Sequence, residues 1–507
     1  MADTGDNWFM VDVWDVAYPI ISLVAFSLLT VPVFKLIRKS MHKTAFSLAW
    51  FAIVFATAFA AVANLTSKYY SVGAPEVLNI TLADTPLAAL SSTFMIDAIS
   101  IYMAIIVVCV SAVVFLYSIF YVKSSEKTSE RYYAVMLMLV AALLGTVFSG
   151  DLLTLFIFWE AAAAGSSFLM VYRKKPESLN AALKYLVMII IASAFIVFGL
   201  SLVYGLTGSL NFWAVKEALT VLADKRLLVL AFIFIATGYA IESAIVPFHF
   251  WLPDAYGAAP ASSASFLSAL IDQGSYYVLI RVLIFILTPT AVLDWRFMLA
   301  VMAALTMIVG NLFALIQDNV KQLIGNVCVA DVGYNLVAIT SVSILGLEGN
   351  LYFFLIGGIT TALSFMTIGI INHYGFKSLD DFSGLGWKMP FASLALTLAA
   401  LSFAGVPPLG GFTAKYLVFT AALQANMAWL AVIGVLASVL QTAYLFRLIN
   451  IMYSKRPKDE KRIKEPKLLL IPVFILIAAI IVLGLYPDIV LRLIAPATGQ
   501  LPIPMIP

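Results

Sequence analysis

Glu242 is an ionisable side chain inside a long apolar segment, five residues before Pro247 in the stretch ATGYAIESAIVPFHFWLPDAYGAAP, residues 236–260. Proline has no N–H and its ring clashes with the preceding turn, so the sequence predicts an interrupted helix at Val246-Pro247. Irregular backbone at membrane depth is tolerated only where protein or water surrounds it. An acid beside a broken helix therefore indicates an ion path, and the alternative is a kinked helix that tolerates one acid.

The composition is that of a membrane protein. Of the 507 residues, 63% are hydrophobic and 11% charged, whereas soluble domains carry about 25% charged residues. A net charge of +3 gives no reason to expect nucleic acid. Two cysteines, three histidines and no phosphate loop or nucleotide motif lead us to expect no metal, no cofactor and no catalytic chemistry in this chain. The N-terminus begins with acids, so we expect no cleaved signal.

Spanning helices need about 20 apolar residues, and fourteen segments meet that length, which predicts an all-α polytopic fold. The segments are 17–37, 45–65, 94–121, 132–149, 151–171, 179–206, 227–252, 260–288, 295–317, 321–345, 350–373, 391–425, 427–453 and 467–487. The twelfth contains AGVPPLGG, in which Pro407, Pro408 and Gly410 predict a second break.

Most of the 30 Lys and Arg residues fall in the loops on one side of these spans. The positive-inside rule then puts both termini outside and the basic loop 454–467 in the cytoplasm. That loop is expected to fix topology, with contact to a partner or to anionic lipid as the second interpretation. A bacterial-type plasma (inner) membrane is the expected location.

The two predicted breaks are five spans apart, and an odd offset inverts direction, so the pattern predicts two inverted five-helix repeats. The predicted units are residues 1–131 (three helices and an outer loop), 132–288 (first repeat), 289–453 (second repeat) and 454–507 (basic loop and last helix). From these patterns alone the chain is transporter-like, with a polar axis at mid-membrane.

Several motifs resemble the antiporter-like membrane subunits shared by respiratory complex I, Mrp-type Na+/H+ antiporters and membrane-bound hydrogenases. They are FMIDAIS (94–100), GDLLTLFIFWEA (150–161), AALKYL (181–186), VPFHFWLPDAY (246–256), the segment 305–334 and SFAGVPPLGGFTAK (402–415). The resemblance covers nearly the whole chain in order. It implies fourteen helices and a hydrated proton path at mid-membrane.

By this resemblance, Glu160 matches the family's glutamate of the fifth helix, with Lys184 as its expected counter-ion. His249 matches the histidine after the first break, and Lys415 the lysine of the twelfth helix. An unpaired carboxylate at the depth of Glu160 is costly, so we expect a direct or water-mediated pair with Lys184.

This chain departs from the family at the central basic positions. Glu242 replaces a lysine, and Gln273, beside Asp272, replaces another. Asp331 precedes Val332-Gly333-Tyr334, where histidine or another polar residue is common. On the eleventh span the usual His and Lys positions fall at Gly357 and Thr361. The resemblance thus implies a relay that has become acidic or neutral.

Two interpretations of these departures remain open. Clustered carboxylates raise one another's pKa, so the acids can relay protons or bind Na+; alternatively the relay is broken and the chain is a scaffold. Asp97 and Asp151 are expected to be helix caps, Asp254 a turn or cap residue, and Arg281 a structural residue able to snorkel.

The expected function is that of an antiporter-like subunit of a multisubunit, redox-linked complex that moves H+ or exchanges Na+ for H+. The expected partners are sister membrane subunits, lipid and a peripheral iron–sulfur arm, without nucleic acid. One alternative is a non-conducting adaptor between ion-pumping and redox modules, and another is a stand-alone secondary transporter.

Overall fold

Long apolar helices dominate the chain, as its hydropathy predicts. The computed structural model describes residues 13–37, 43–71, 78–81, 92–122, 129–222, 226–289, 293–454 and 462–498. Residues 455–461 of the predicted basic loop 454–467 and the acids Asp3, Asp6 and Asp12 fall outside the described residues. In the described part, twelve helices are long and apolar enough to cross a membrane.

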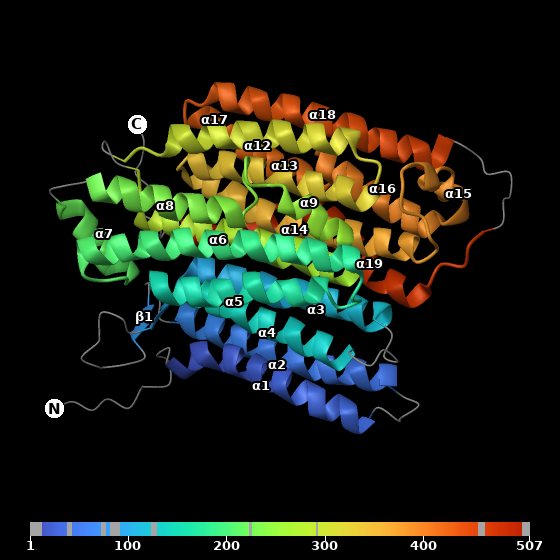
Figure 1. Ribbon diagram of the computed structural model, residues 1–507, viewed down its shortest axis with the longest axis horizontal. Coiled ribbons are helices and arrows are strands. Elements are labelled where there is room, and N and C mark those ends of the chain that lie inside the picture. Colours follow the sequence, from blue (N-terminus) through green and yellow to red (C-terminus); the bar gives the residue numbers. More distant parts are fainter. Residues whose placement is uncertain are drawn as a thin grey trace.

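The helices of the first half run side by side along the long axis of the molecule, beginning with α1 and α2 at one edge (Figure 1). Their bounds are α1 (Val13–Ile37), α2 (Lys43–Ser71), α3 (Ala98–Tyr121), α4 (Ser129–Phe148), α5 (Leu152–Met170), α6 (Pro176–Thr207), α7 (Phe212–Val221), α8 (Arg226–Glu242), α9 (Trp251–Ala258), α10 (Ala261–Phe266) and α11 (Asp272–Leu279).

The helices of the second half continue across the bundle, and α17 and α18 lie at the edge opposite α1 and α2 (Figure 1). The helices of this half are α12 (Arg296–Ile316), α13 (Val320–Thr340), α14 (Ile344–Asn372), α15 (Leu385–Lys388), α16 (Pro390–Ala404), α17 (Gly410–Gln424), α18 (Ala428–Ser454), α19 (Lys467–Leu485) and α20 (Asp488–Thr498). A short 3-10 turn, η4 (Asp380–Phe382), precedes α15.

Both predicted interruptions are confirmed. The seventh predicted span is divided into α8 and α9 by residues 243–250, and the twelfth into α16 and α17 by residues 405–409. The prolines that predicted the interruptions lie between the divided helices, Val246-Pro247 in the first interruption and Pro407-Pro408 in the second. Twelve spans and these two divided helices occupy the positions of the fourteen predicted segments; the inverted repeat relation and the domain bounds stay predictions.

The eighth predicted span is helical throughout but irregular. α10 passes into a π-helical segment, η2 (Leu267–Ile271), then α11, then a second π-helical segment, η3 (Ile280–Ile286). All of the described residues of this span are buried. π-bulges inside helices often occur at functional sites, and Asp272 is the first residue after η2.

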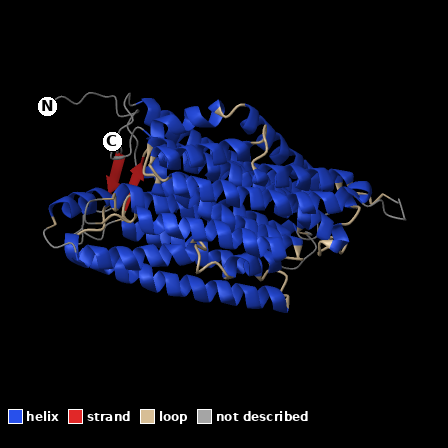
Figure 2. Ribbon diagram, turned by 90° about the horizontal axis from the view of Figure 1, so that it is seen from above, coloured by secondary structure: helices blue, strands red, loops and turns tan. Residues whose placement is uncertain are grey.

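Several short elements were not predicted. α7 and α20 are short helices of 10 and 11 residues, too short to span. β1 (Leu78–Thr81) pairs antiparallel with β2 (Thr93–Ile96), so the stretch predicted to begin the third helix starts as a strand. The two short strands lie at one end of the bundle (Figure 2).

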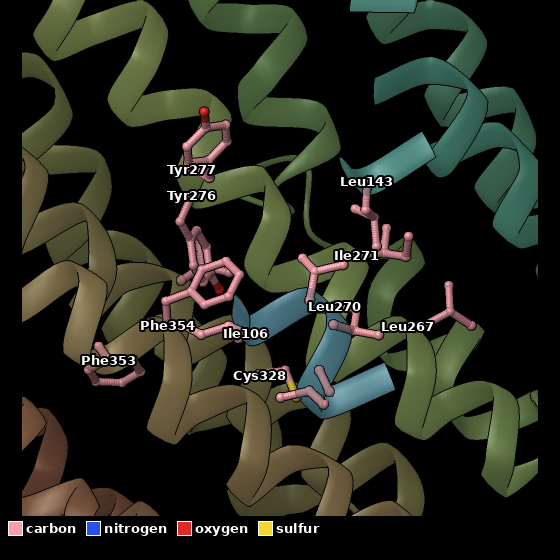
Figure 3. Close-up of a cluster of buried hydrophobic side chains, with 14 of the residues drawn as sticks. Ile106, Leu143, Leu267, Leu270, Ile271, Tyr276, Tyr277, Cys328, Phe353 and Phe354 are labelled. Carbon is pink, nitrogen blue, oxygen red and sulfur yellow. The ribbon is translucent and has the colours of Figure 1, made fainter. Parts of the chain in front are cut away.

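The core lies around the eighth span, in the middle of the bundle. Figure 3 shows apolar side chains converging there from several helices: Ile106 (α3), Leu143 (α4), Leu267, Leu270 and Ile271 (η2), Tyr276 and Tyr277 (α11), Cys328 (α13), Phe353 and Phe354 (α14). Most of these side chains are almost fully buried. Polar groups placed among them are therefore held in a medium that contains few other polar partners.

Candidate functional site

The first break leaves backbone groups that the helix no longer bonds, and neighbouring groups satisfy several of them. The N–H of Val246 donates to Thr306 Oγ1 on α12 at 3.1 Å, and the indole of Trp251 donates to the carbonyl of Ile241 at 3.0 Å. The N–H of Ile245 reaches the carbonyl of Ala240 at 2.9 Å. The break is thus a defined turn whose backbone groups are partly satisfied by neighbouring side chains, although Pro247 and Phe250 are exposed.

Glu242 is the last residue of α8 and faces the interior. It is 5% exposed, and its Oε2 accepts a hydrogen bond from Trp159 Nε1 on α5 at 2.5 Å. Its Oε1 is buried and has no hydrogen-bond partner. Glu242 thus faces the protein interior rather than lipid, and its hydrogen-bond donor is an indole rather than a basic side chain.

A second acid lies directly beside Glu242. The carboxyl group of Glu160, the next residue after Trp159, is close enough for a direct interaction with that of Glu242. Ser193 Oγ on α6 also donates to Glu160 Oε1, at 2.5 Å. Among the described residues neither acid forms an ion pair. Two adjacent carboxylates, one buried and one half-buried, repel each other when both are ionised, so the pair is suited to share a proton.

The second break presents the opposite charge. α16 ends at Ala404, and Gly405 continues with φ of 74°, a left-handed conformation that glycine adopts without strain. Lys415 lies on α17, just after the break, and its Cδ would be 3.3 Å from a Cβ at Gly405. The lysine is 6% exposed, so its ammonium group depends on partners within the protein.

Those partners are mostly neutral. Lys415 Nζ donates to Gln441 Oε1 at 2.5 Å and to Ser438 Oγ at 3.0 Å, both on α18. The same atom lies 4.3 Å from the ring centroid of Tyr334, a favourable cation–π position. The acid within electrostatic range is Asp331, one turn before Tyr334 on α13.

The first half of the second divided helix, α16, is held at its N-terminus by an acid outside the spans. Glu465 accepts hydrogen bonds from the backbone N–H groups of Phe391 and Ala392, at 3.0 and 2.7 Å. Burial raises the pKa of Glu465 above its usual range, although both backbone bonds oppose that rise. The carboxyl therefore caps the N-terminus of α16 and fixes where the divided helix begins.

Asp331 and Asp272 are buried acids between the two breaks. They are 2% and 6% exposed, and no oxygen of either carboxyl has a hydrogen-bond partner. Asp331 lines a small cavity of about 10 Å³ with Lys415, Thr360 and Ser402, close to the space that one water molecule needs. The two acids influence each other electrostatically. Both carboxyls therefore need protons, water or the nearby lysine to be stable.

A tyrosine and a cysteine lie between the acids at the first break and the charged residues at the second. Tyr185 on α6 lies within electrostatic range of Glu160, Glu242 and Asp272, and Cys328 on α13 lies within range of Asp272 and Asp331. The helices that carry these groups follow one another across the bundle, from α5 to α17 (Figure 1). The ionisable groups thus form a row from Glu160 to Lys415, which we call the buried row.

Gln273 and Gly357 leave the middle of the buried row without a base. Gln273 is 1% exposed and its Oε1 has no partner. A Cβ at Gly357 on α14 would lie 3.4 Å from that oxygen. The resemblance leads us to expect basic residues at both positions. In this chain the neutral amide of Gln273 instead lies beside Gly357, which has no side chain.

The predicted ion pair between Glu160 and Lys184 is wrong. Lys184 Nζ instead contacts Asp254 Oδ2 at 2.8 Å, and the side chains of the two residues are 64% and 40% exposed. Both line a groove of about 750 Å³ on the outside of the bundle, between α6 and α9. Lys184 lies on the exposed side of α6 while its neighbour Tyr185 is buried, a difference that sequence spacing alone did not show. Asp254, expected to be a turn or cap residue, is its partner.

His249 also lies apart from the contacts just described. It is 3% exposed and lies in the first break, with the rings of Phe250 and Phe313 at centroid distances of 4.2 and 5.7 Å. Its Nδ1 has no hydrogen-bond partner. Within the described residues His249 forms no ion pair, so it is a polar group near the first break without a charged neighbour.

Two expected caps are confirmed, and one carries an unexpected partner. Asp151 caps α5 through Thr154, at 2.7 Å, and Asp97 caps α3 through Ser100. Asp97 also binds Arg281 in a bidentate ion pair, at 2.5 and 2.6 Å, in which the arginine is 0% exposed. Arg281 therefore does not snorkel; it joins α3 to η3 through a fully buried ion pair.

Sequence reasoning missed the neutral groups that hold the charged ones. They are Trp159, Ser193, Tyr334, Ser438 and Gln441. Trp159 and Tyr334 stand inside motifs already singled out, so their proximity to an acid was visible. Ser193, Ser438 and Gln441 lie outside those motifs, and only packing brings them to the site.

Comparison with known proteins agrees with this arrangement. Residues 149–441 match the model of the NADH:quinone oxidoreductase/Mrp antiporter transmembrane family, and residues 85–133 match that of the N-terminus of complex I chain 5. The chain belongs to this antiporter-like family. The first match includes all eight candidate residues of the site, from Glu160 to Lys415.

Two curated relatives extend the likeness over most of the chain. NADH-quinone oxidoreductase subunit N of Thioalkalivibrio sulfidiphilus is 33% identical, over 86% of this chain and 91% of its own. F(420)H(2) dehydrogenase subunit N of Methanosarcina mazei is 30% identical, over 78% of this chain and 83% of its own. This protein is accordingly an antiporter-like membrane subunit of a multisubunit, redox-linked type of complex.

Solved structures show the same fold. A chain of the archaeal membrane-bound sulfane sulfur reductase matches with a TM-score of 0.84 and 26% identity, covering 95% of this chain and 97% of that one. A chain of the Mrp complex from a Dietzia species has a TM-score of 0.83 at 22% identity, covering 97% and 98%. The latter likeness concerns the fold alone.

Proposed function

We propose that this antiporter-like subunit moves protons along the buried row between its two broken helices. The observation that carries the proposal is that a buried charged side chain lies beside each break, Glu242 at the first and Lys415 at the second. Carboxyl groups with unsatisfied oxygens lie between them. Discontinuous helices with charged groups at mid-membrane are a recurring feature of ion-transport sites.

Energetics favour proton sharing. Three buried acids cannot all be ionised beside one lysine, because each uncompensated buried charge costs several kcal/mol. Glu160 and Glu242 are adjacent, and Asp331 lies beside Lys415. The Glu160–Glu242 pair is stabilised by holding protons, whereas ionised Asp331 is compensated by the ammonium group of Lys415. A proton can move along the row when water or a neighbouring group accepts it. H+ is therefore the proposed ion, with Na+ as the alternative to be tested.

The membrane arrangement belongs to the same proposal. The charge pattern supports termini on the outer side of a plasma (inner) membrane and a cytoplasmic basic loop at 454–467. The relatives' names support partnership with other membrane subunits of a complex of the NADH-quinone oxidoreductase, F(420)H(2) dehydrogenase or sulfane sulfur reductase kind. A peripheral iron–sulfur arm as electron donor is part of this proposal.

A second candidate function rests on the neutral middle of the buried row. Gln273 faces bare backbone at Gly357, so no base connects the acidic first group to the lysine of the second. In that case the chain is a non-conducting adaptor, which keeps the fold and the interfaces of the family.

The test is ion translocation by the assembled complex in sealed vesicles. Glu242→Gln and Lys415→Gln should each lower proton uptake, while complex yield and electron transfer without a gradient stay unchanged. Glu217→Gln on α7, which removes an exposed acid, is the matched control. Replacing sodium by choline should not alter uptake if H+ is the moving ion. Normal uptake by both variants would refute conduction and leave the adaptor function.

A further inference from the structure

A cavity at the end of the bundle, away from the buried row, is lined by basic side chains. It has a volume of about 170 Å³, several times the space that one water molecule needs. Five segments converge on it: the end of α3, the link from α5 to α6, the link from α9 to α10, the start of α13 and the link after α14. Since these segments are far apart in sequence, only the tertiary structure forms the cavity.

The lining is strongly positive. Its cations are Arg173, Lys175, Lys321 and Lys377, and His373 is also present. The single carboxylate in the lining is Glu177. Of the acids nearby, Asp381 already accepts the backbone N–H groups of Lys377 and Ser378, both at 2.9 Å, and these bonds lower its pKa.

Lys321 is the buried member of this group. It is 7% exposed, and its Nζ donates to the carbonyls of Gly257, at 3.2 Å, and Ala259. Both acceptors are neutral, and among the described residues Lys321 has no ion pair. A buried ammonium group without a counter-ion is unfavourable, so an anion in the adjoining cavity would stabilise it.

Two further features of the cavity wall favour the binding of an oxyanion. The guanidinium of Arg173 lies 4.8 Å from the ring centroid of Tyr121, which holds it in the cavity wall. α6, a helix of 32 residues, begins here with Lys175 as an N-cap that makes no side-chain bond. Its first N–H groups, near the cavity residues Glu177 and Ser178, therefore add positive potential.

We infer that this cavity binds a phosphate group. Guanidinium and ammonium groups around a helix N-terminus are the donors that phosphate oxygens prefer. The phosphate of an acidic phospholipid and free inorganic phosphate share this chemistry. The site is independent of the buried row, so it stands whether or not the chain conducts protons.

The experiment uses the full chain in its purified complex, delipidated in detergent. Phosphatidylglycerol and phosphatidylcholine are titrated and counted by native mass spectrometry, and inorganic phosphate is measured by equilibrium dialysis. Arg173→Gln and Lys321→Gln are compared with Lys388→Gln, a matched cation outside the cavity. Arg173→Gln changes a side chain at the cavity wall and tests the inference even if Lys321→Gln fails to assemble.

We expect one phosphatidylglycerol per chain, held about tenfold more weakly in Arg173→Gln and Lys321→Gln and unchanged in Lys388→Gln. That result supports a lipid phosphate. Binding of inorganic phosphate with the same variant pattern, without retained phosphatidylglycerol, supports the site with a free phosphate. Equal retention of phosphatidylcholine, or native affinity for both probes in both cavity variants, would overturn the inference.

Discussion

The two interrupted helices carry opposite charges beside their breaks, Glu242 before the first and Lys415 after the second, and each charge has a different environment. At the first break, Glu242 contacts an indole N–H and a second acid. At the second, Lys415 contacts an amide oxygen, a hydroxyl and an aromatic ring, with Asp331 in range. The first group therefore carries an excess of acid, whereas the second pairs a base with an acid.

This difference shows which group depends on protonation. The lysine group can approach neutrality with Asp331 ionised, through charge compensation inside the protein. The Glu160–Glu242 pair has no cation among the described residues, so it is neutral only when both acids hold protons. A change in proton supply therefore acts first on the acidic pair, which we place at the start of the proposed proton path.

The largest effect is expected at the buried Asp97–Arg281 ion pair, which lies outside both groups and in which each charge is compensated by the other. Arg281→Leu leaves Asp97 buried without its partner, a change that costs about 3–5 kcal/mol. We expect loss of assembled chain, measured as complex yield and by thermal unfolding. Arg296→Leu, in a more exposed pair with Asp294, is the control and should assemble normally. Normal yield from Arg281→Leu would show that the pair is not structural.

The second prediction concerns the base at the second break. Lys415→Leu should lower proton uptake by about tenfold or more, because Asp331 then has no nearby base to compensate it. Lys415→Arg should retain more activity than Lys415→Leu, since the charge is kept. Uptake by reconstituted complex is the measurement, and Lys388→Leu is the control. Equal activity of the arginine and leucine variants would contradict a role for the charge.

The third prediction separates the acidic pair into its members. Glu242→Gln and Glu160→Gln should each lower uptake by about tenfold, and the double variant should lose little more, because adjacent groups that share a proton are not independent. Glu242→Lys, which places a base beside Glu160, should be less harmful than Glu242→Leu. Strictly additive losses in the double variant would show that the two carboxyls act separately.

The smallest effect is expected at the exposed pair. Lys184→Gln should change the stability of the complex by at most about 1 kcal/mol, because exposed ion pairs contribute little, and proton uptake by less than about twofold. Uptake and thermal unfolding are again the measurements. A tenfold loss of uptake would mean that Lys184 acts in the path despite its position, and would restore the expected pairing with Glu160 in another state of the protein.

Most of the fold was predictable. The length of the apolar segments predicted where the long helices lie, and Pro247, Pro407 and Pro408 predicted the two breaks, because these signals are local in sequence. The π-helical segments in the eighth span, the β1–β2 hairpin and α7 were not predictable, since they depend on neighbours or on short, weak patterns. The site was predicted in part: Glu242 does face the interior, but Lys184 does not meet Glu160. On a helix with apolar residues on all sides, such as α6, hydrophobic periodicity does not show which face is buried.

By itself the sequence determined that the chain is a membrane protein with two broken helices and rare ionisable groups in its spans. Lipid admits no unsatisfied backbone and few charges, so those residues stand out against their surroundings. Only the tertiary structure decided partners: Glu160 with Glu242, Lys415 with Gln441, Lys184 with Asp254 and Asp97 with Arg281. Partners come from helices distant in the chain, and their contact depends on helix rotation and packing, which side-chain spacing along one helix does not specify.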